Sequence, residues 1–375
     1  SIYTYLEQRF GRHSYRTGAL FFLVSKLFGA AAKLFLITLI LQQLVFTPLG
    51  VPYPVTVISV VAIIWLYTQR GGMGTIIWTD VLQTACLVLA LILIIYVVST
   101  ELGLDVPGIV RLVRQDPHSR IFVFDDWTSP LYFWKQIVSG TFIVIVMTGL
   151  DQNMMQKNLT CRTLRDAQKD MCVYGLSFLP INALLLGLGV LLYHFCEMQH
   201  IALPAKSDEL LPMLVSSGTL GHLVVLPFTI GIVAAAFSAA DGAITALTTS
   251  FCIDILDRED DVRLRRGAHA AVVVLCFVCL LIFRLVDSPN VINTIYVMAS
   301  YTYGPLLGLF AFGLYTQWQI RDRYVPAVVI AAPIATALLD HYAPIWWGYT
   351  FGYELLILNG GLTALGLFAL RRFKK

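Results

Sequence analysis

Residues 234–251 read AAAFSAADGAITALTTSF, a stretch with the apolar length of a membrane-spanning helix that nevertheless contains a carboxylate, Asp241. Hydroxyl groups flank this carboxylate, from Ser238 on one side and from Thr245 and Thr249 on the other. An ionisable group in the hydrocarbon layer is costly, and such residues are retained mainly for function. The stretch therefore predicts a buried helix that carries a polar site.

Steps of three or four residues place the small and oxygen-bearing side chains of this stretch on one helix face. They are Ala235, Ser238, Asp241, Thr245 and Thr249. Small residues let another helix approach closely, and hydroxyls beside a carboxylate form a hard-oxygen environment that suits an alkali cation. The structural alternative is that the hydroxyls bond to carbonyls one turn back while Asp241 is paired or protonated.

The composition of the whole chain indicates a membrane protein. Of 375 residues, 58% are hydrophobic and 13% are charged, whereas about a quarter of the residues in soluble domains are charged. Lipid is therefore the expected solvent, and the fold class is predicted to be all-α and polytopic. Cys276 and Cys279 form a CxxC without a second pair, which favours packing over a metal site. The basic residues are not interleaved with aromatics, so no nucleic-acid partner is expected.

Windows of about 20 apolar residues predict ten transmembrane helices. Their approximate bounds are 17–46, 52–69, 74–99, 131–153, 172–195, 222–255, 267–286, 290–316, 325–340 and 350–370. The span at 325–340 is the weakest because it is short and carries Pro326 and Pro333. The long loop at 100–130 is expected to contain a short surface helix near 107–115.

The distribution of basic residues predicts the orientation of these spans. Of the 26 Lys and Arg residues, 18 fall in one alternating set of loops and five in the other. The positive-inside rule then places both ends of the chain in the cytoplasm, with the plasma (inner) membrane as the expected location. The chain opens at Ser1 in a polar stretch, which is typical of a loop entered from something upstream and suggests a fragment.

Two further ionisable residues lie inside predicted spans. Asp80 stands about 9 Å from the start of its helix. At this depth, two roles for Asp80 are weighed equally: a functional carboxylate, or a carboxylate at the membrane interface that reaches water. Lys33 lies in the middle of the first span, from which it would snorkel poorly. It is expected to face the bundle, either in a structural ion pair with Asp241 or Asp80 or in contact with an anionic substrate.

Four stretches occur in fixed order and together resemble the sodium:solute symporter family. YTYLEQRFG (3–11) resembles the motif after its second core helix, and GGMGTIIWTDVLQ (71–83) the turn that opens its fifth. GLDQNMMQKNLTCRTLRDAQK (149–169) resembles the stretch that closes the sixth core helix, and AAAFSAADGAITALTTSFCIDIL (234–256) resembles the eighth. The resemblance covers the length of the chain.

The resemblance implies a LeuT-like fold of two inverted five-helix repeats, here without the first two core helices. Residues 1–375 are then a single, partial transmembrane transporter domain. Within it, 1–130 holds the rest of the first repeat with an outer loop, 131–316 the second repeat, and 317–375 peripheral helices. The implied activity is symport of a small organic solute with sodium as coupling ion, and the implied partners are sodium, the solute and the lipid bilayer, with no protein partner. An enzyme is not expected, because the spans contain no Ser/His or HExxH pattern.

The implied sodium site takes the carbonyl of Ala235 and the hydroxyl of Ser238, while Ala239 stands where many members have Ser or Thr. A second site, present in some members, corresponds here to Asp80, Ser238, Asp241 and Gly242, with Asp241 standing where a Ser ligand would be. Two close carboxylates also bind a proton, so proton coupling through Asp241 and Asp80 is the alternative to sodium. A membrane sensor related to the symporters is the alternative from a different functional class.

The substrate site is expected to include Lys33, Val144, Met147 and Tyr301. Met147 stands where sugar-transporting members often have a gate tyrosine, which weakens the case for a sugar. Lys33 favours a carboxylate substrate. Tyr301 lies in a span interrupted by Gly and Pro, where it would act as a gate or as a packing aromatic.

Overall fold

The computed structural model describes residues 1–68, 73–151, 154–155, 158, 160–258, 261–285 and 291–372. Within some helices only the backbone is described, at residues 67–68, 73–77, 79, 241 and 291–294. The side chain of Asp241, the central residue of the sequence-based hypothesis, therefore lies outside the described residues.

The described chain is all-α apart from one isolated bridge between Ile320 and Arg371. Its α-helices are α1 (Thr4–Arg9), α2 (Arg12–Leu41), α3 (Tyr53–Thr68), α4 (Met73–Glu101), α5 (Val106–Gln115), α6 (Phe133–Gly149), α8 (Leu164–Met198), α9 (Leu210–Ser216), α10 (His222–Ser250), α11 (Val262–Leu285), α12 (Val291–Tyr315), α13 (Val325–Trp347) and α14 (Leu355–Ala369). Two π-helical turns, Gln42–Phe46 and Phe251–Ile255, continue α2 and α10.

Seven helices in the described ranges are long and apolar enough to cross a membrane. They are Arg12–Phe46, Asp80–Glu101, Leu164–Met198, His222–Ile255, Val262–Leu285, Ile295–Tyr315 and Asp322–Trp347. Three shorter apolar helices, at Tyr53–Leu66, Phe133–Gly149 and Leu355–Ala369, coincide with the other three predicted spans. The all-α, polytopic prediction is confirmed, and the count of ten spans stays a prediction.

The predicted surface helix is present as α5, and its cap explains where it starts. Asp105 precedes the helix, and its side chain accepts a hydrogen bond from the backbone of Gly108 at 2.8 Å, which satisfies one of the free amides of the first turn. Pro107 occupies the first turn, where its missing amide hydrogen costs nothing.

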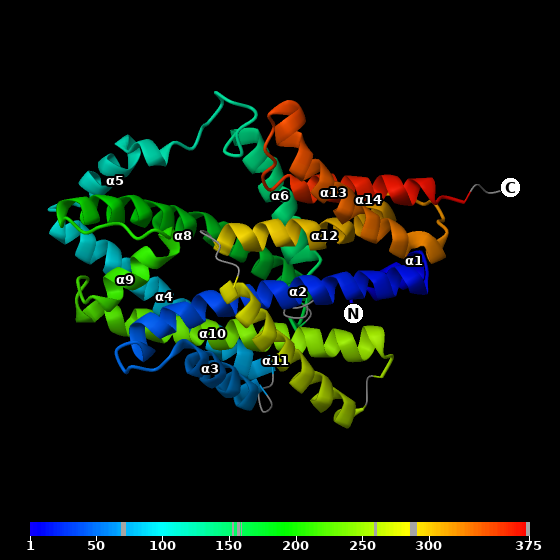
Figure 1. Cartoon of the computed structure of the whole chain (residues 1–375), viewed down its shortest axis with the longest axis horizontal. Helices are drawn as coiled ribbons and strands as arrows, with labels where there is room; N and C mark the ends of the chain where they lie inside the picture. Colours follow the sequence, from blue (N-terminus) through cyan, green and yellow to red (C-terminus); the bar gives the residue numbers. More distant parts are fainter. Residues whose placement is uncertain are drawn as a thin grey trace.

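Helices α2, α10 and α12 run along the long axis of the molecule (Figure 1). Helix α10 packs against both α2 and α4, and α12 packs against α2. A first apolar core joins these elements through fully buried residues such as Leu34, Ile94 and Ile244. A second core, around Phe22 and Leu306, joins the start of α2 to α12 and α14.

Helices α12 and α14 approach each other closely. A Cβ atom added to Gly308 would lie 2.6 Å from the backbone oxygen of Gly360 and 2.6 Å from Cβ of Thr363. Only glycine permits this approach, because real Cβ atoms do not come so close to a backbone atom.

Gly308→Ala is therefore expected to destabilise the folded protein by about 1–3 kcal/mol through overpacking. The measurement is the thermal unfolding temperature of the purified protein in detergent. Gly361→Ala on α14 is the matched control, because a Cβ at Gly361 meets nothing within 4 Å. Equal unfolding temperatures for the two variants would contradict the close approach.

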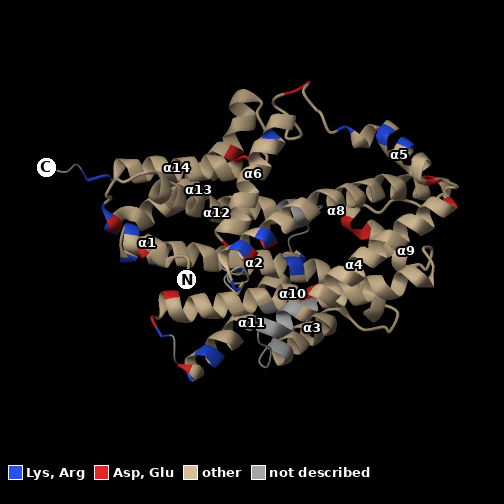
Figure 2. Ribbon diagram, turned by 180° about the vertical axis from the view of Figure 1, so that it is seen from behind, with Lys and Arg blue, Asp and Glu red and all other residues tan. Residues whose placement is uncertain are grey.

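Several of the basic segments meet at one end of the molecule. The Arg9 guanidinium donates a hydrogen bond to the carbonyl of Thr316 at 2.8 Å, and Arg12 forms an ion pair with Asp257. Asp322 accepts hydrogen bonds at the amino end of α2, which fixes the loop after α12 to that helix. Figure 2 shows Lys and Arg near α1 and toward the C-terminus at this end. The contacts show that these loops share one end of the bundle.

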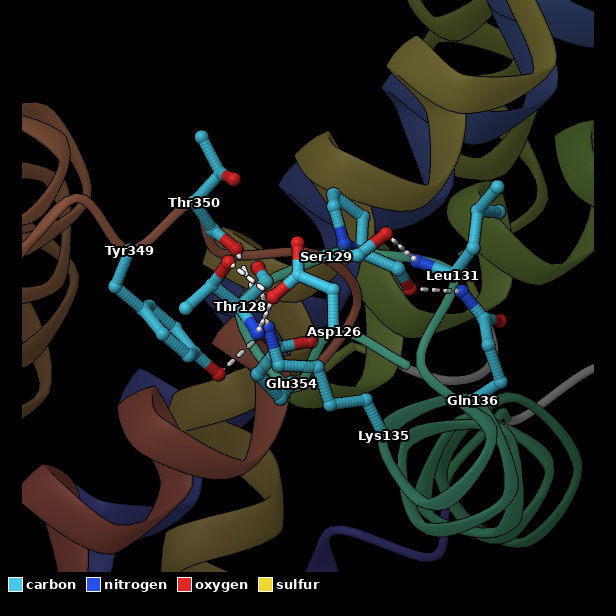
Figure 3. A network of polar contacts seen from close by, with 10 residues as sticks. Asp126, Thr128, Ser129, Leu131, Lys135, Gln136, Tyr349, Thr350 and Glu354 are labelled. Carbon is cyan, nitrogen blue, oxygen red and sulfur yellow. Dashed lines mark hydrogen bonds and ion pairs between the residues drawn. The ribbon is translucent and has the colours of Figure 1, made fainter. Parts of the chain in front are cut away.

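A polar network ties the loop before α6 to the loop before α14 (Figure 3). Lys135 Nζ donates a hydrogen bond to the carbonyl of Thr128 at 3.1 Å, lies 3.5 Å from Glu354 Oε1, and sits 3.7 Å from the ring centroid of Tyr349. In the same loop, hydrogen bonds from the hydroxyl and amide of Thr128 lower the pKa of Asp126. The network fixes the amino ends of α6 and α14 to each other.

Candidate functional site

A cavity of about 490 Å³ lies between α2, α4, α6, α10 and α12. Its walls are mostly apolar, but they also carry polar and charged side chains from α2, α4, α10, α12 and the end of α6. These are Ser25, Lys26, Lys33, Gln83, Asp151, Ser238, Thr302 and Tyr303. Apolar walls with a few convergent polar groups are typical of a small-molecule site. The cavity is therefore the candidate binding site.

A buried ion pair forms one part of the cavity wall. Lys26 Nζ lies 2.7 Å from Asp151 Oδ2 and 3.0 Å from Oδ1, and the two side chains are only 15% and 8% exposed. The hydroxyl of Tyr303 donates to Asp151 Oδ2 at 3.1 Å, and the amide of Met154 donates to Oδ1 at 3.3 Å. Asp151 thus connects α2, α12 and the end of α6.

The position of Asp151 is set by the end of α6. Leu150 caps that helix, and its carbonyl accepts a hydrogen bond from the hydroxyl of Tyr3 at 2.9 Å. The hydrogen bond holds the backbone just beyond Gly149 against the start of the chain, and the Lys26–Asp151 pair then ties it to α2. The Lys26–Asp151 pair was not predicted, although Lys26 and Asp151 each place a charge within a predicted apolar span, which was a usable signal.

The oxygen-rich face of α10 meets α4 at the cavity edge. Ser238 Oγ donates a hydrogen bond directly to Asp80 Oδ1, and Ala235, Ser238 and Ala239 line the cavity. The two helices approach closely near Gly231, where an added Cβ would lie 2.7 Å from Leu87 Cδ2. The structure therefore brings two residues of the predicted cation site, Asp80 and Ser238, into contact, and Ala235 lies one turn from Ser238 on α10.

The chemistry of these groups fits an alkali cation. A carboxylate, a hydroxyl and a main-chain carbonyl are the hard oxygen ligands that alkali and alkaline-earth ions take in proteins. Asp241 lies on α10 one turn beyond Ser238, but the direction of its side chain is outside the described residues. Its part in the site stays a prediction.

Lys33 lines the cavity, and its side chain is exposed to that space. No residue that the structure describes forms a hydrogen bond or ion pair with Lys33 Nζ. The expected structural pair of Lys33 with Asp80 is therefore not formed, and Asp80 instead contacts Ser238. A pair with Asp241 falls outside the described side chains.

Of the other three predicted substrate residues, only Met147 lines the cavity. Met147 lines the cavity, whereas Val144 on the same helix is 55% exposed and is not among the described residues that line it. The hydroxyl of Tyr301 donates to Asp340 Oδ2 at 2.8 Å, which directs this ring toward α13. Of the predicted substrate residues, Lys33 and Met147 thus share the cavity.

Comparison with known proteins gives the family of this chain. The sequence model of the sodium:solute symporter family matches residues 1–320. The chain belongs to the sodium:solute symporter family. This is a family of membrane transporters and not of enzymes, and sodium is its coupling ion.

Two relatives illustrate the similarity within the sodium:solute symporters. The chain is 27% identical over 336 residues to the human sodium/iodide cotransporter, covering 84% of this chain and 50% of the relative. It is 22% identical over 337 residues to the mouse sodium-coupled monocarboxylate transporter 2, covering 85% of this chain and 53% of the relative. The chain thus spans about half the length of these curated relatives.

A solved symporter structure shows the same fold. It is the substrate-bound, outward-open state of a Na⁺-coupled sialic acid symporter, which superposes with a TM-score of 0.77 at 18% sequence identity. The superposition covers 98% of this chain and 76% of that structure. The family and the polytopic, all-α architecture are thus confirmed, while the ligands of each site stay a matter of inference.

Proposed function

We propose that the full-length protein is a secondary active transporter that uses the sodium gradient to import a small solute by alternating access. The observation that carries this proposal is the hydrogen bond between Ser238 and Asp80 at the edge of the candidate cavity. Sodium bound there would stabilise the state that accepts solute, because two ligands that favour the same state raise each other's affinity.

The architecture is proposed to be LeuT-like, with both described ends in the cytoplasm of a plasma (inner) membrane protein. The apolar helices would correspond to core helices three to ten and two peripheral ones. The first repeat then continues through 130, the second covers 131–316, and 317–375 is peripheral. The meeting of the basic loops at one end supports this orientation.

The site residues are proposed to divide into two groups. Asp80, Ser238, Asp241 and the carbonyl of Ala235 would hold the coupling cation. Lys33 and Met147, which line the same cavity, would contact the solute. The two relatives described above are a sodium/iodide cotransporter and a sodium-coupled monocarboxylate transporter. Iodide and monocarboxylates are therefore the first solutes to test.

Uptake by the full-length protein in proteoliposomes is expected to require an inward sodium gradient. The measurement is the initial uptake rate of radiolabelled iodide and of a radiolabelled monocarboxylate, with potassium or choline replacing sodium as the control. Uptake that persists without sodium and is driven by a proton gradient would contradict sodium coupling. That result would favour the alternative, in which Asp80 and Asp241 exchange a proton.

A further inference from the structure

Helix α5 has a surface that the proposed transport does not use. The helix lies at the end of the molecule away from α1 and the C-terminus, and it carries basic residues there (Figure 1 and Figure 2). One side of α5 packs on the bundle. Ile109 and Leu112 pack against the first apolar core, and Val113 Cγ2 lies 3.8 Å from the position that a Cβ atom on Gly187 of α8 would take.

Contacts at both ends fix the orientation of α5. At its amino end, Asp105 accepts the hydrogen bond from the amide of Gly108. At its carboxyl end, Asp116 Oδ1 accepts a hydrogen bond from the amide of His118 at 2.7 Å, and Asp116 Oδ2 lies 2.9 Å from Nε2 of His194 on α8. The helix is therefore held to α8 with one side facing away from the bundle.

The side that faces away combines apolar and basic residues. Val106 and Val110 are 73% and 62% exposed, and the side chains of Arg111 and Arg114 are also exposed. A shallow surface hollow here is lined by Pro107, Val110, Arg111, Arg114 and Gln115. We call this set, together with Val106, the outer face of α5.

The two arginines of the outer face are available to bind an anion. No carboxylate in the part of the chain that the structure describes forms an ion pair with Arg111 or Arg114. The two aspartates that flank α5 are engaged in the contacts above, and Asp125 forms an ion pair with Arg120. Because Arg111 and Arg114 are three residues apart on one helix, their guanidinium groups can reach the same anion.

The outer face also lies beside the surface of a membrane helix. Helix α8 is one of the described helices that are long and apolar enough to cross a membrane. Leu186, next to the contact of Gly187 with Val113, is 75% exposed, and Leu179 two turns earlier is exposed as well. An exposed leucine on such a helix faces acyl chains. The exposed valines and arginines of α5 thus lie at the edge of the lipid-facing surface, where headgroups are expected.

We infer that the outer face of α5 binds an anionic phospholipid. Arg111 and Arg114 hold its phosphate, because guanidinium groups donate paired hydrogen bonds to phosphate oxygens. Val106 and Val110 contact its acyl chain. The valines favour a lipid over a soluble phosphate, since a soluble anion would leave both of them in water. This inference goes beyond the proposed function and does not depend on the cation site or on the solute.

The test is thermal unfolding of the purified full-length protein in an uncharged detergent, in choline chloride without sodium or solute. The probes are phosphatidylglycerol, phosphatidylcholine and soluble glycerol 3-phosphate. Phosphatidylglycerol should stabilise the protein with an apparent affinity about tenfold or more above that of phosphatidylcholine, because two arginines attract its net negative charge. Glycerol 3-phosphate at the same phosphate concentration should stabilise it little.

The variants make the result specific to α5. Arg111→Gln combined with Arg114→Gln should reduce the affinity for phosphatidylglycerol to that for phosphatidylcholine. Val106→Ser combined with Val110→Ser should weaken the response to both lipids. Arg120→Gln is the matched control from the same loop, because Arg120 is already paired with Asp125, and it should keep the preference.

The altered side chains are exposed, so the unfolding temperature without lipid should stay close to that of the unmodified protein. Equal affinities for the two lipids in the unmodified protein would overturn the inference. A preference that survives the loss of both arginines would also overturn it, because the anionic lipid would then bind elsewhere. Glycerol 3-phosphate that stabilises as well as phosphatidylglycerol, and only when the arginines are present, would show a soluble phosphate site instead. Neither sodium nor solute is present, so these results are independent of the proposed function.

Discussion

Asp80→Asn in the full-length protein is expected to raise the sodium concentration for half-maximal uptake by about tenfold or more. Asparagine keeps the volume of Asp80 and can still accept the hydrogen bond from Ser238, but it removes the negative charge. The loss should therefore fall on cation affinity while the packing of α4 against α10 is kept. The measurement is the sodium dependence of initial uptake rates at saturating solute.

Asp340→Asn provides the matched control for this change. Asp340 lies on α13, where it accepts a hydrogen bond from the hydroxyl of Tyr301 at 2.8 Å, and it is not among the described residues that line the cavity. Its replacement should leave the sodium dependence unchanged. If Asp80→Asn and Asp340→Asn had the same sodium dependence as the unmodified protein, the coupling cation would bind elsewhere.

Lys26→Met and Asp151→Asn are each expected to destabilise the protein by about 3–5 kcal/mol, because each leaves a buried charge without its partner. The double variant should recover most of this loss, since neither charge remains. The measurements are the amount of protein in the membrane and its unfolding temperature in detergent.

The two single variants differ in the hydrogen-bond partners that remain for the unpaired charge. Lys26→Met leaves Asp151 with the hydroxyl of Tyr303 and the amide of Met154 as donors, whereas Asp151→Asn leaves Lys26 with a single neutral acceptor. Additive losses in the double variant would contradict the pair, because they would show that the two side chains do not interact.

The membrane-spanning helices could be predicted because their length and apolarity are local properties of the sequence. The end of α13 shows the limit of that approach. The prediction stopped at 340, where Asp340 and His341 interrupt the apolar run, but the helix continues to Trp347. The carboxylate is tolerated there because it bonds to Tyr301 on another helix, and this contact depends on packing that no single segment reveals.

The candidate site could be predicted only in part for the same reason. Ser238 and Asp80 were identified from their motifs, and the structure places them in contact. Lys26 and Asp151 are 125 positions apart in sequence, so their pairing follows from how α2 packs beside the end of α6. The helical period shows which residues share a face but not which face meets a cavity, and so it did not separate Val144 from Met147.

Equilibrium binding of radioactive sodium to the purified full-length protein tests the central claim most directly, because it requires no knowledge of the solute. We expect saturable binding that unlabelled sodium displaces and potassium does not. We also expect the affinity to fall by about tenfold or more in Asp80→Asn and to stay unchanged in Asp340→Asn. Sodium binding of equal affinity in the unmodified protein and in Asp80→Asn would contradict the assignment of the cation to Asp80 and Ser238.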